Sequence, residues 1–203
     1  MLTAESIAVD PPAEGEIVDP VAWFDTPGSF ELEIGCGKGG FLLDRALANP
    51  GVRLLGIEWA NKYYRYCADR MARRGVSNVR VMRTDARFFV MNHLGAGCVD
   101  VLHLYHPDPW PKKRHHKRRL IQPDFVDAAV RVLSARGRWL VQSDHAEYFQ
   151  EMSDLLSRHE GLAEVPWEEA EASSGSGWQG TNFEIKYVRE GREIHRAAYV
   201  ART

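Results

Sequence analysis

The sequence lacks the features that mark membrane-spanning, secreted and fibrous proteins. No apolar run approaches the ~20 residues that span a bilayer, and the N-terminus has neither the basic nor the apolar segment of a secretion signal. The three cysteines are too few and too far apart for a disulfide framework or a zinc knuckle. We therefore expect a cytoplasmic protein without a membrane or metal partner, and its 203 residues fit one domain.

Positive charge is missing from the first 37 residues, which contain eight acidic residues and no Lys or Arg. Between Arg53 and Arg138 the balance reverses, with 18 basic and 7 acidic residues, although the whole chain carries a formal net charge of −2. A segment this basic in a nearly neutral protein indicates a face that binds a polyanion. Scattered charges are also typical of solvated helix faces. The prediction of a polyanion-binding face therefore depends on the charges that cluster at residues 112–119.

Apolar periodicity predicts alternating strands and helices after an irregular acidic N-terminal arm at residues 1–28. The predicted strands are residues 30–34, 52–57, 79–82, 99–104 and 139–141. The predicted helices are residues 41–48, 61–74, 123–133 and 146–158. A hairpin of residues 183–189 and 193–200 follows. This alternation predicts an α/β domain at residues 29–203, with a Rossmann-like, mostly parallel sheet and a C-terminal antiparallel hairpin at its edge.

The first predicted strand runs into a glycine-rich loop, residues 35–40 (GCGKGG), which opens a helix. Glycines there let the backbone approach a ligand closely, so we expect cofactor contacts from Gly35 and Gly37. Glu58 ends the second strand, where a carboxylate accepts hydrogen bonds from both hydroxyls of a ribose. Dinucleotide dehydrogenases share these features, so the glycines alone do not identify the ligand.

Two further acidic residues favour S-adenosylmethionine over a dinucleotide. Glu33 lies two residues before the first glycine, where it can face the ammonium group of the methionine moiety, and Asp85 is placed to accept from an adenine amino group. For each residue alone, a helix cap or a solvated loop is an equally good interpretation. With Glu58 they lie at successive strand ends, on the edge where open α/β sheets bind ligands. The sequence therefore predicts the fold of S-adenosylmethionine-dependent methyltransferases.

The loop after the fourth strand combines rigidity, one carboxylate and a cluster of positive charge. Three prolines surround Asp108 and Trp110, and six Lys or Arg with two His fill residues 112–119. Such a cluster is typical of a site that binds phosphates. A targeting signal or a solvated run is the simpler alternative, but this cluster begins directly beside a candidate active-site loop.

Together these motifs resemble the bacterial tRNA (guanine-N7)-methyltransferase family over residues 30–199. The matching segments are residues 33–39, 56–58, 107–115, 143–144 and 181–184. The most specific of them is residues 107–115 (PDPWPKKRH). The resemblance implies transfer of a methyl group from S-adenosyl-L-methionine to N7 of a guanine, guanosine-46 in the variable loop of tRNA.

The resemblance also implies which residues form the site. The implied cofactor contacts are Glu33, Glu58, Asp85 and Asp108, and Asp108 is also the implied catalytic residue. The implied contacts with tRNA or guanine are Lys112, Asp144, Thr181, Asn182, Phe183 and Glu184. The chain departs from the family at His106, where Phe is common, and at Asn182, where Lys is common. The expected partner is tRNA, and the protein is expected to be a monomer or a homodimer.

The chemistry requires little from the protein beyond positioning and electrostatics. N7 of guanine has a lone pair and no hydrogen, so its methylation needs no general base. Asp108 can accept from the Watson–Crick edge of guanine and favour the cationic product.

Two other functions stay open. One is an amino-methyltransferase acting on another nucleic-acid base, because residues 108–110 also resemble the Asp/Asn-Pro-Pro-aromatic loop of those enzymes. The other is a non-catalytic RNA-binding module.

Overall fold

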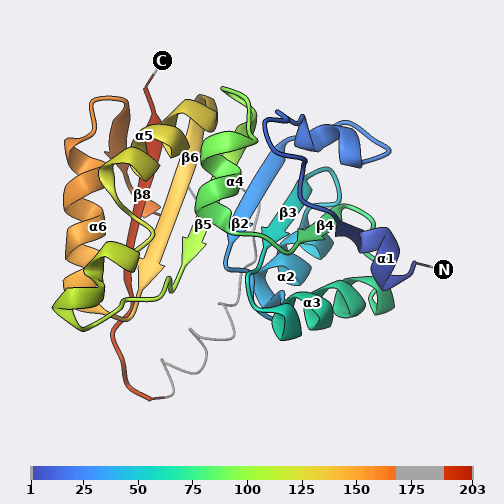
Figure 1. The fold of residues 1–203 in the computed structure, drawn as a ribbon, viewed down its shortest axis with the longest axis horizontal. Coiled ribbons are helices and arrows are strands. Elements are labelled where there is room, and N and C mark those ends of the chain that lie inside the picture. Colours follow the sequence, from blue (N-terminus) through green and yellow to red (C-terminus); the bar gives the residue numbers. More distant parts are fainter. Residues whose placement is uncertain (1, 168–189, 203) are drawn as a thin grey trace.

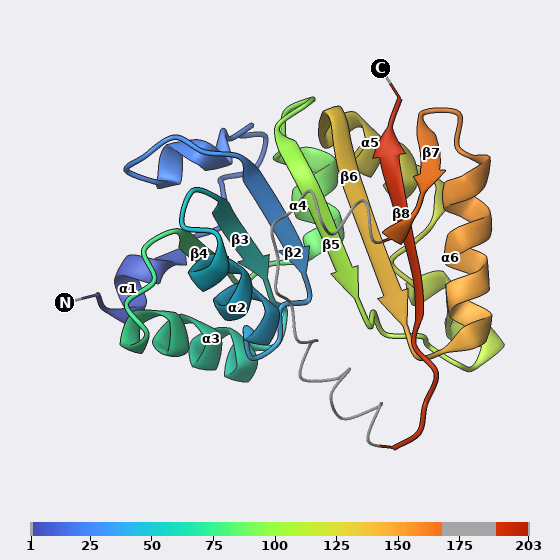
Figure 2. The same ribbon diagram turned by 180° about the vertical axis from the view of Figure 1, so that it is seen from behind.

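The computed structural model describes residues 2–167 and 190–202, which form an eight-stranded sheet covered by helices (Figures 1 and 2). The strands are β1 (Ala8–Val9), β2 (Phe30–Ile34), β3 (Arg53–Ile57), β4 (Val79–Met82), β5 (Val99–Tyr105), β6 (Leu133–Ser143), β7 (Leu162–Val165) and β8 (His195–Ala201). Their order in the sheet is β1-β4-β3-β2-β5-β6-β8-β7. Strands β1 to β6 pair in parallel, whereas β8 is antiparallel to both β6 and β7. The predicted fold class is therefore confirmed.

The helices cover both faces of the sheet (Figures 1 and 2). One face carries α4 (Ala86–Asn92), α5 (Pro123–Val132) and α6 (Ala146–Arg158), and the other carries α2 (Gly40–Ala48) and α3 (Asn61–Arg73). The larger core lies on the first face and includes Phe89, Phe125 and Met152. The second core includes Leu42 and Met71. In the described part of the chain, no helix has the combination of length and apolar character needed to cross a membrane.

After the N-terminal arm, α4, β6 and β7 differ from the elements expected. Helix α4 was not predicted, because its seven residues are too few to establish a helical period. Strand β6 begins at Leu133 rather than at Trp139, because its pairing with β5 shifts register and Arg136 adopts a left-handed φ of 61°. Strand β7 was also not predicted, and it forms the sheet edge beside β8. The first strand of the expected hairpin, residues 183–189, lies outside the described residues.

The N-terminal arm contains regular structure where the sequence predicted none. Thr3 and Ser6 exchange hydrogen bonds at the start of α1 (Ala4–Ile7), and Ile7 is fully buried in the core beneath α3. Strand β1 then pairs with β4. After the 3₁₀ helix η1 (Pro20–Trp23), the buried Arg53 binds the arm through hydrogen bonds from Nε to Thr26 O (2.7 Å) and from Nη2 to Pro27 O (2.9 Å). These elements are too short to produce a periodic pattern in the sequence.

Candidate active site

Strand β2 leads directly into the glycine-rich loop at the carboxyl end of the sheet. Gly35, Gly37 and Gly39 all adopt left-handed backbone conformations, with φ values of 76°, 54° and 66°. A Cβ at Gly39 would collide with Cys67 of α3, so a glycine is needed where the loop packs on that helix. A Cβ at Gly35 would meet no described atom within 4 Å. The loop is therefore packed on one side and open to a ligand on the other.

Glu58 connects the end of β3 to this loop. Its Oε2 accepts a hydrogen bond from the backbone N–H of Gly37 (2.9 Å), and its Oε1 accepts one from Ala60 (2.7 Å). The parallel pairing of β2 with β3, which sets Glu33 opposite Gly56, brings the two segments together. Glu58 thus lies beside the open part of the glycine-rich loop, where the sequence predicted a ribose contact.

Two glutamates on β2 are buried to a similar extent but differ in their hydrogen-bond partners. Glu31 and Glu33 are two residues apart on one strand and therefore face the same side of the sheet. Burial alone would raise the pKa of Glu31, but hydrogen bonds with Arg45 and His103 outweigh it and lower the pKa to about 2. Glu33 Oε2 has no hydrogen-bond partner in the described part of the chain. Burial, assisted by the charge of Glu58, raises the pKa of Glu33 to about 8.

The unpartnered oxygen of Glu33 fits the predicted cofactor. A carboxylate that is only 4% exposed needs a compensating charge or hydrogen bond to remain ionised. The ammonium group of S-adenosylmethionine carries both a positive charge and N–H donors. The free carboxylate acceptor at this edge therefore suits a ligand with a cationic end beside the glycine-rich loop.

Asp85 follows β4 and combines two roles that the sequence left as alternatives. Its Oδ1 accepts a hydrogen bond from the backbone N–H of Phe88 (2.9 Å), so it caps α4. The side chain is nevertheless exposed, and its Oδ2 has no partner among residues 2–167 and 190–202. One carboxylate oxygen thus remains available to a ligand at the edge of the sheet.

Asp108 lies on a loop with an unusual backbone. His106 and Trp110, two residues before and after it, both adopt left-handed φ values of 52° and 44°. Non-glycine residues in this region are strained and need support from their surroundings. Asp108 itself is exposed and makes no hydrogen bond within the described residues. The loop therefore presents one uncommitted carboxylate on a constrained backbone.

Arg119 supplies much of the support for this loop. Its side chain is 1% exposed, and its Nε donates to the carbonyl oxygen of Pro109 (2.7 Å). Its two terminal nitrogens pair with Glu147 and Glu151 of α6, and the guanidinium lies 4.8 Å from the ring centroid of Tyr148. The sequence grouped Arg119 with the other Lys and Arg residues of 112–119 as a phosphate-binding cluster. Arg119 does not fit that prediction, because it is buried and links the loop to α6.

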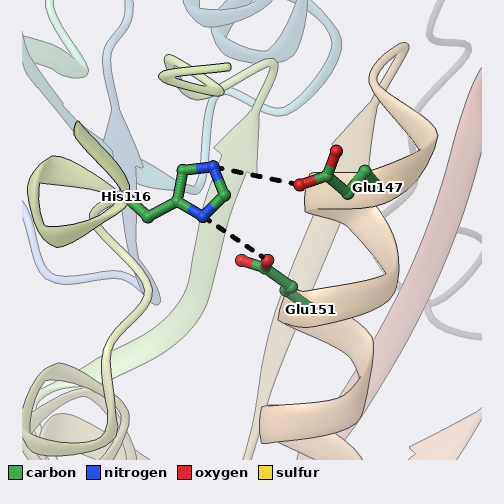
Figure 3. A group of neighbouring side chains, drawn as sticks. All are labelled: His116, Glu147 and Glu151. Carbon is green, nitrogen blue, oxygen red and sulfur yellow. Dashed lines mark ion pairs between the residues drawn. The ribbon is translucent and has the colours of Figure 1, made fainter. Parts of the chain in front are cut away.

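A second contact also links this loop segment to α6 (Figure 3). His116 lies in the 3₁₀ helix η2 (Lys113–Arg118), with Nε2 3.9 Å from Glu147 Oε1 and Nδ1 4.0 Å from Glu151 Oε1. A histidine with two carboxylates has the composition of a metal site. However, Arg119 also contacts both carboxylates, so a bound cation would lie beside a fixed positive charge. The arrangement is better suited to holding η2 against α6.

The remaining basic residues of this segment are on the surface. Those that are exposed are Lys112, Lys113, Arg114, Lys117 and Arg118. The Arg118 guanidinium lies 5.0 Å from the ring centroid of Trp110, and the His115 ring meets the same indole edge-on at 5.9 Å. Trp110 therefore packs within the loop. The five exposed residues, called the η2 basic surface below, form a concentration of positive charge next to Asp108.

Asp144 follows β6 and is held by residues that sequence reasoning did not assign. Its Oδ1 lies 3.3 Å from His106 Nδ1, and its Oδ2 accepts from Arg192 Nη1 (2.8 Å). Gln142 Nε2 lies 2.8 Å from His106 Nε2, so the imidazole bridges Gln142 and Asp144. The signals for this network are a polar Gln142 within an apolar strand and His106 in place of the usual Phe. Thr181, Asn182, Phe183 and Glu184 lie outside the described residues.

Comparisons with known proteins match this chain over most of its length. The family model described as "Putative methyltransferase" matches residues 28–197. The aminoglycoside resistance methyltransferase NpmB1 has the same fold, with a TM-score of 0.57 at 14% identity over 90% of each chain. The family match defines this chain as a methyltransferase, and its fold is the one found in S-adenosylmethionine-dependent methyltransferases.

The curated relatives narrow this class. The tRNA (guanine-N(7)-)-methyltransferase of Geobacter metallireducens is 30% identical over 187 residues, covering 91% of this chain and 89% of the relative. That of Streptococcus pyogenes serotype M6 is 33% identical over 177 residues, covering 86% and 83%. This chain belongs to the tRNA (guanine-N7)-methyltransferase family, as its motifs predicted.

Proposed function

We propose that this enzyme transfers a methyl group from S-adenosylmethionine to N7 of a guanine in tRNA, and that the target is guanosine-46 of the variable loop. The names of its relatives support the reaction. The observation that carries the proposal is the combination found at one sheet edge. There, the buried, unpartnered Glu33 suits a cationic cofactor, and the exposed Asp108 lies beside the η2 basic surface.

On the cofactor side, each residue has a separate task. The backbone of Gly35 and Gly37 leaves room for the cofactor, and Glu33 accepts from its ammonium group. Glu58 accepts from the ribose hydroxyls, and the available oxygen of Asp85 accepts from the adenine amine. S-adenosylmethionine, when bound, supplies an electrophilic methyl group on a sulfonium. The protein therefore needs only to hold this group in line with the acceptor nitrogen.

On the substrate side, Asp108 holds the guanine and stabilises the product. Its carboxylate accepts from N1–H or the N2 amino group, which turns N7 toward the methyl group, and its charge favours the developing cation. Lys112 and the other residues of the η2 basic surface bind phosphates and set the position of the tRNA. The target base must leave its stack to reach the loop. Contacts from Asp144 and from residues 181–184 are further expectations of the family resemblance.

The test uses an unmodified tRNA transcript and isotopically labelled cofactor. We expect one labelled nucleoside, N7-methylguanosine, identified by mass spectrometry after complete digestion. A transcript in which guanosine-46 is replaced by adenosine serves as the matched substrate control and should accept no label.

The other outcomes select between the alternatives. Label on an exocyclic amino group would replace the proposal with an amino-methyltransferase. Binding of cofactor and tRNA without any transfer would favour a non-catalytic RNA-binding module. Label at N7 of a guanine other than guanosine-46 would keep the reaction and reject the position.

A further inference from the structure

The outer face of α3 carries aromatic and basic side chains in a continuous stripe. Lys62, Tyr66 and Arg70 are spaced four residues apart, so they lie one above another on the helix, and Tyr63 adjoins them. Tyr63 and Tyr66 are 40% and 46% exposed. The opposite face of α3, which includes Met71, is buried in the core. Packing of α3 therefore does not require the two exposed tyrosines.

This stripe borders the glycine-rich loop. Arg70 Nη1 donates to the carbonyl oxygen of Lys38 (3.1 Å), and Lys38 Nζ lies 6.0 Å from the ring centroid of Tyr66. Lys38 follows Gly37 directly, so the contact joins the helix surface to the predicted cofactor site. We call the five residues Lys38, Lys62, Tyr63, Tyr66 and Arg70 the α3 stripe.

The charge of the α3 stripe is not neutralised by nearby acids. Within the described ranges, no Asp or Glu pairs with Lys38, Lys62 or Arg70. Asp69, which lies on the same helix, pairs instead with Arg73 (2.7 Å). Three cations interleaved with two exposed aromatic rings are the combination that binds RNA strands, because phosphates pair with the cations and bases stack on the rings.

The α3 stripe and the η2 basic surface lie on two sides of the predicted site. Helix α3 begins just after the end of β3, and η2 contacts the first turns of α6, which follows β6. Both elements therefore lie toward the carboxyl ends of the strands, at the lower end of the molecule in Figures 1 and 2. A nucleic acid that touched both surfaces would pass over the glycine-rich loop.

We propose that the α3 stripe is a second RNA-contact surface, which binds the tRNA on the cofactor side of the target base. This inference rests on the proposed function, because it takes tRNA as the substrate. The stripe stacks unpaired bases on Tyr63 and Tyr66 and binds phosphates through Lys38, Lys62 and Arg70. The η2 basic surface, in turn, binds the strand on the far side of Asp108.

Two double variants test the stripe in the full-length protein. Tyr63→Ala with Tyr66→Ala removes the rings, and Lys62→Gln with Arg70→Gln removes two charges. The matched control is Arg158→Gln with Arg202→Gln, two exposed arginines outside this edge. We expect the tyrosine variant to bind the tRNA transcript roughly tenfold more weakly. The charge variant should lower the slope of log affinity against log salt by about 0.7 for each phosphate that the protein no longer neutralises. The control should bind like the wild type.

Further measurements separate this inference from its alternatives. Calorimetry with S-adenosylmethionine should give affinities within twofold of the wild type for both stripe variants. An equal loss of cofactor affinity would assign the stripe to the cofactor site and overturn the inference. A change in the oligomeric mass of the tyrosine variant would overturn it in favour of a protein interface.

A variant of the other basic surface, Lys113→Gln with Lys117→Gln, distinguishes failure of the inference from failure of the proposed function. If this variant loses tRNA affinity while the stripe variants do not, the stripe is not an RNA surface and the proposed function stands. If none of the variants affects tRNA binding, both the stripe and the proposed use of the η2 basic surface are rejected.

Discussion

The two sides of the site position their carboxylates in different ways. On the cofactor side, Glu58 and Asp85 are held by backbone N–H groups within a few residues or on the adjoining loop. On the substrate side, the loop of Asp108 depends on Arg119, whose partners are on α6. Asp144 likewise depends on a histidine and an arginine that are distant in sequence. The cofactor side is thus built by local backbone geometry, and the substrate side by long-range side-chain contacts.

This difference has a functional consequence. A site held by backbone groups tolerates most changes elsewhere, because only a proline at the donor position removes a backbone N–H. A site held by a buried charged network can be lost through residues that never touch the substrate. Changes that break the substrate side should therefore spare cofactor binding, and the following predictions test that separation from the largest expected effect to the smallest.

The largest effect is expected for Asp108→Ala. Loss of the anchoring carboxylate should lower the methyl-transfer rate about 10²- to 10³-fold, the usual cost of removing one electrostatic interaction in a transition state. Affinities for tRNA and cofactor should change much less. Single-turnover rates at saturating substrates measure this, with Asp44→Ala as a control for loss of an exposed carboxylate. Near-wild-type chemistry would remove Asp108 from the mechanism.

Arg119→Ala tests the support beneath Asp108. The variant loses charged hydrogen bonds to Pro109, Glu147 and Glu151, so its free energy of unfolding in urea should fall by about 1.5–3 kcal/mol. Arg118→Ala, the exposed neighbour, should stay within about 0.5 kcal/mol of the wild type. Cofactor affinity should be unchanged in both.

The conservative variant Arg119→Lys sharpens this prediction. A single ammonium cannot donate to the Pro109 carbonyl and to both carboxylates with the geometry of a guanidinium. We expect its transfer rate to remain at least tenfold below that of the wild type at full tRNA occupancy. Equal stability of the Arg118 and Arg119 alanine variants would show that the loop does not depend on Arg119.

Glu58→Ala tests the cofactor side. Loss of its charge-assisted hydrogen bonds should cost about 1.5–3 kcal/mol, or roughly ten- to a hundredfold in S-adenosylmethionine affinity by calorimetry. The tRNA affinity should not change. Asp154→Ala, an exposed carboxylate on α6, is the control. An unchanged cofactor affinity in a folded Glu58 variant would contradict the assignment.

The last comparison concerns the pH dependence of Glu33, whose effect develops gradually over several pH units. Its pKa is raised to about 8 in the folded protein, whereas the unfolded chain titrates near the ordinary value of 4.5. The ligand-free fold therefore holds an extra proton between these values, and its stability should fall as pH rises from about 5 to 8. Thermal unfolding should show this decline, and Glu33→Gln should flatten it.

Cofactor binding should show the opposite trend. A bound ammonium favours the ionised carboxylate of Glu33, so binding releases a proton and affinity should rise with pH between about 6 and 7.5. The rise should be at most tenfold per pH unit and should disappear in Glu33→Gln. Calorimetry in buffers of different ionisation enthalpy measures the released proton. Equal proton release by the wild type and the variant would contradict the role of Glu33.

Several parts of the protein were determined by the sequence itself. Strand β2, helix α6 and the glycine-rich loop follow from periodicity and from glycines, because backbone preferences act between neighbouring residues. The placement of Glu33, Glu58 and Asp85 at one edge follows equally, since the carboxyl ends of parallel strands meet there. The string at residues 107–115 was specific enough to indicate the family.

The tertiary structure alone decided which charged residues are buried and with which partners. Arg118 and Arg119 are neighbours of the same type, yet one is exposed and the other is fixed against α6. Glu31 and Glu33 lie on one strand, yet only Glu31 has an arginine and a histidine beside it. The free energy of a buried charge depends on groups that folding brings from distant segments of the chain. No local pattern in the sequence shows which of those groups will become its partners.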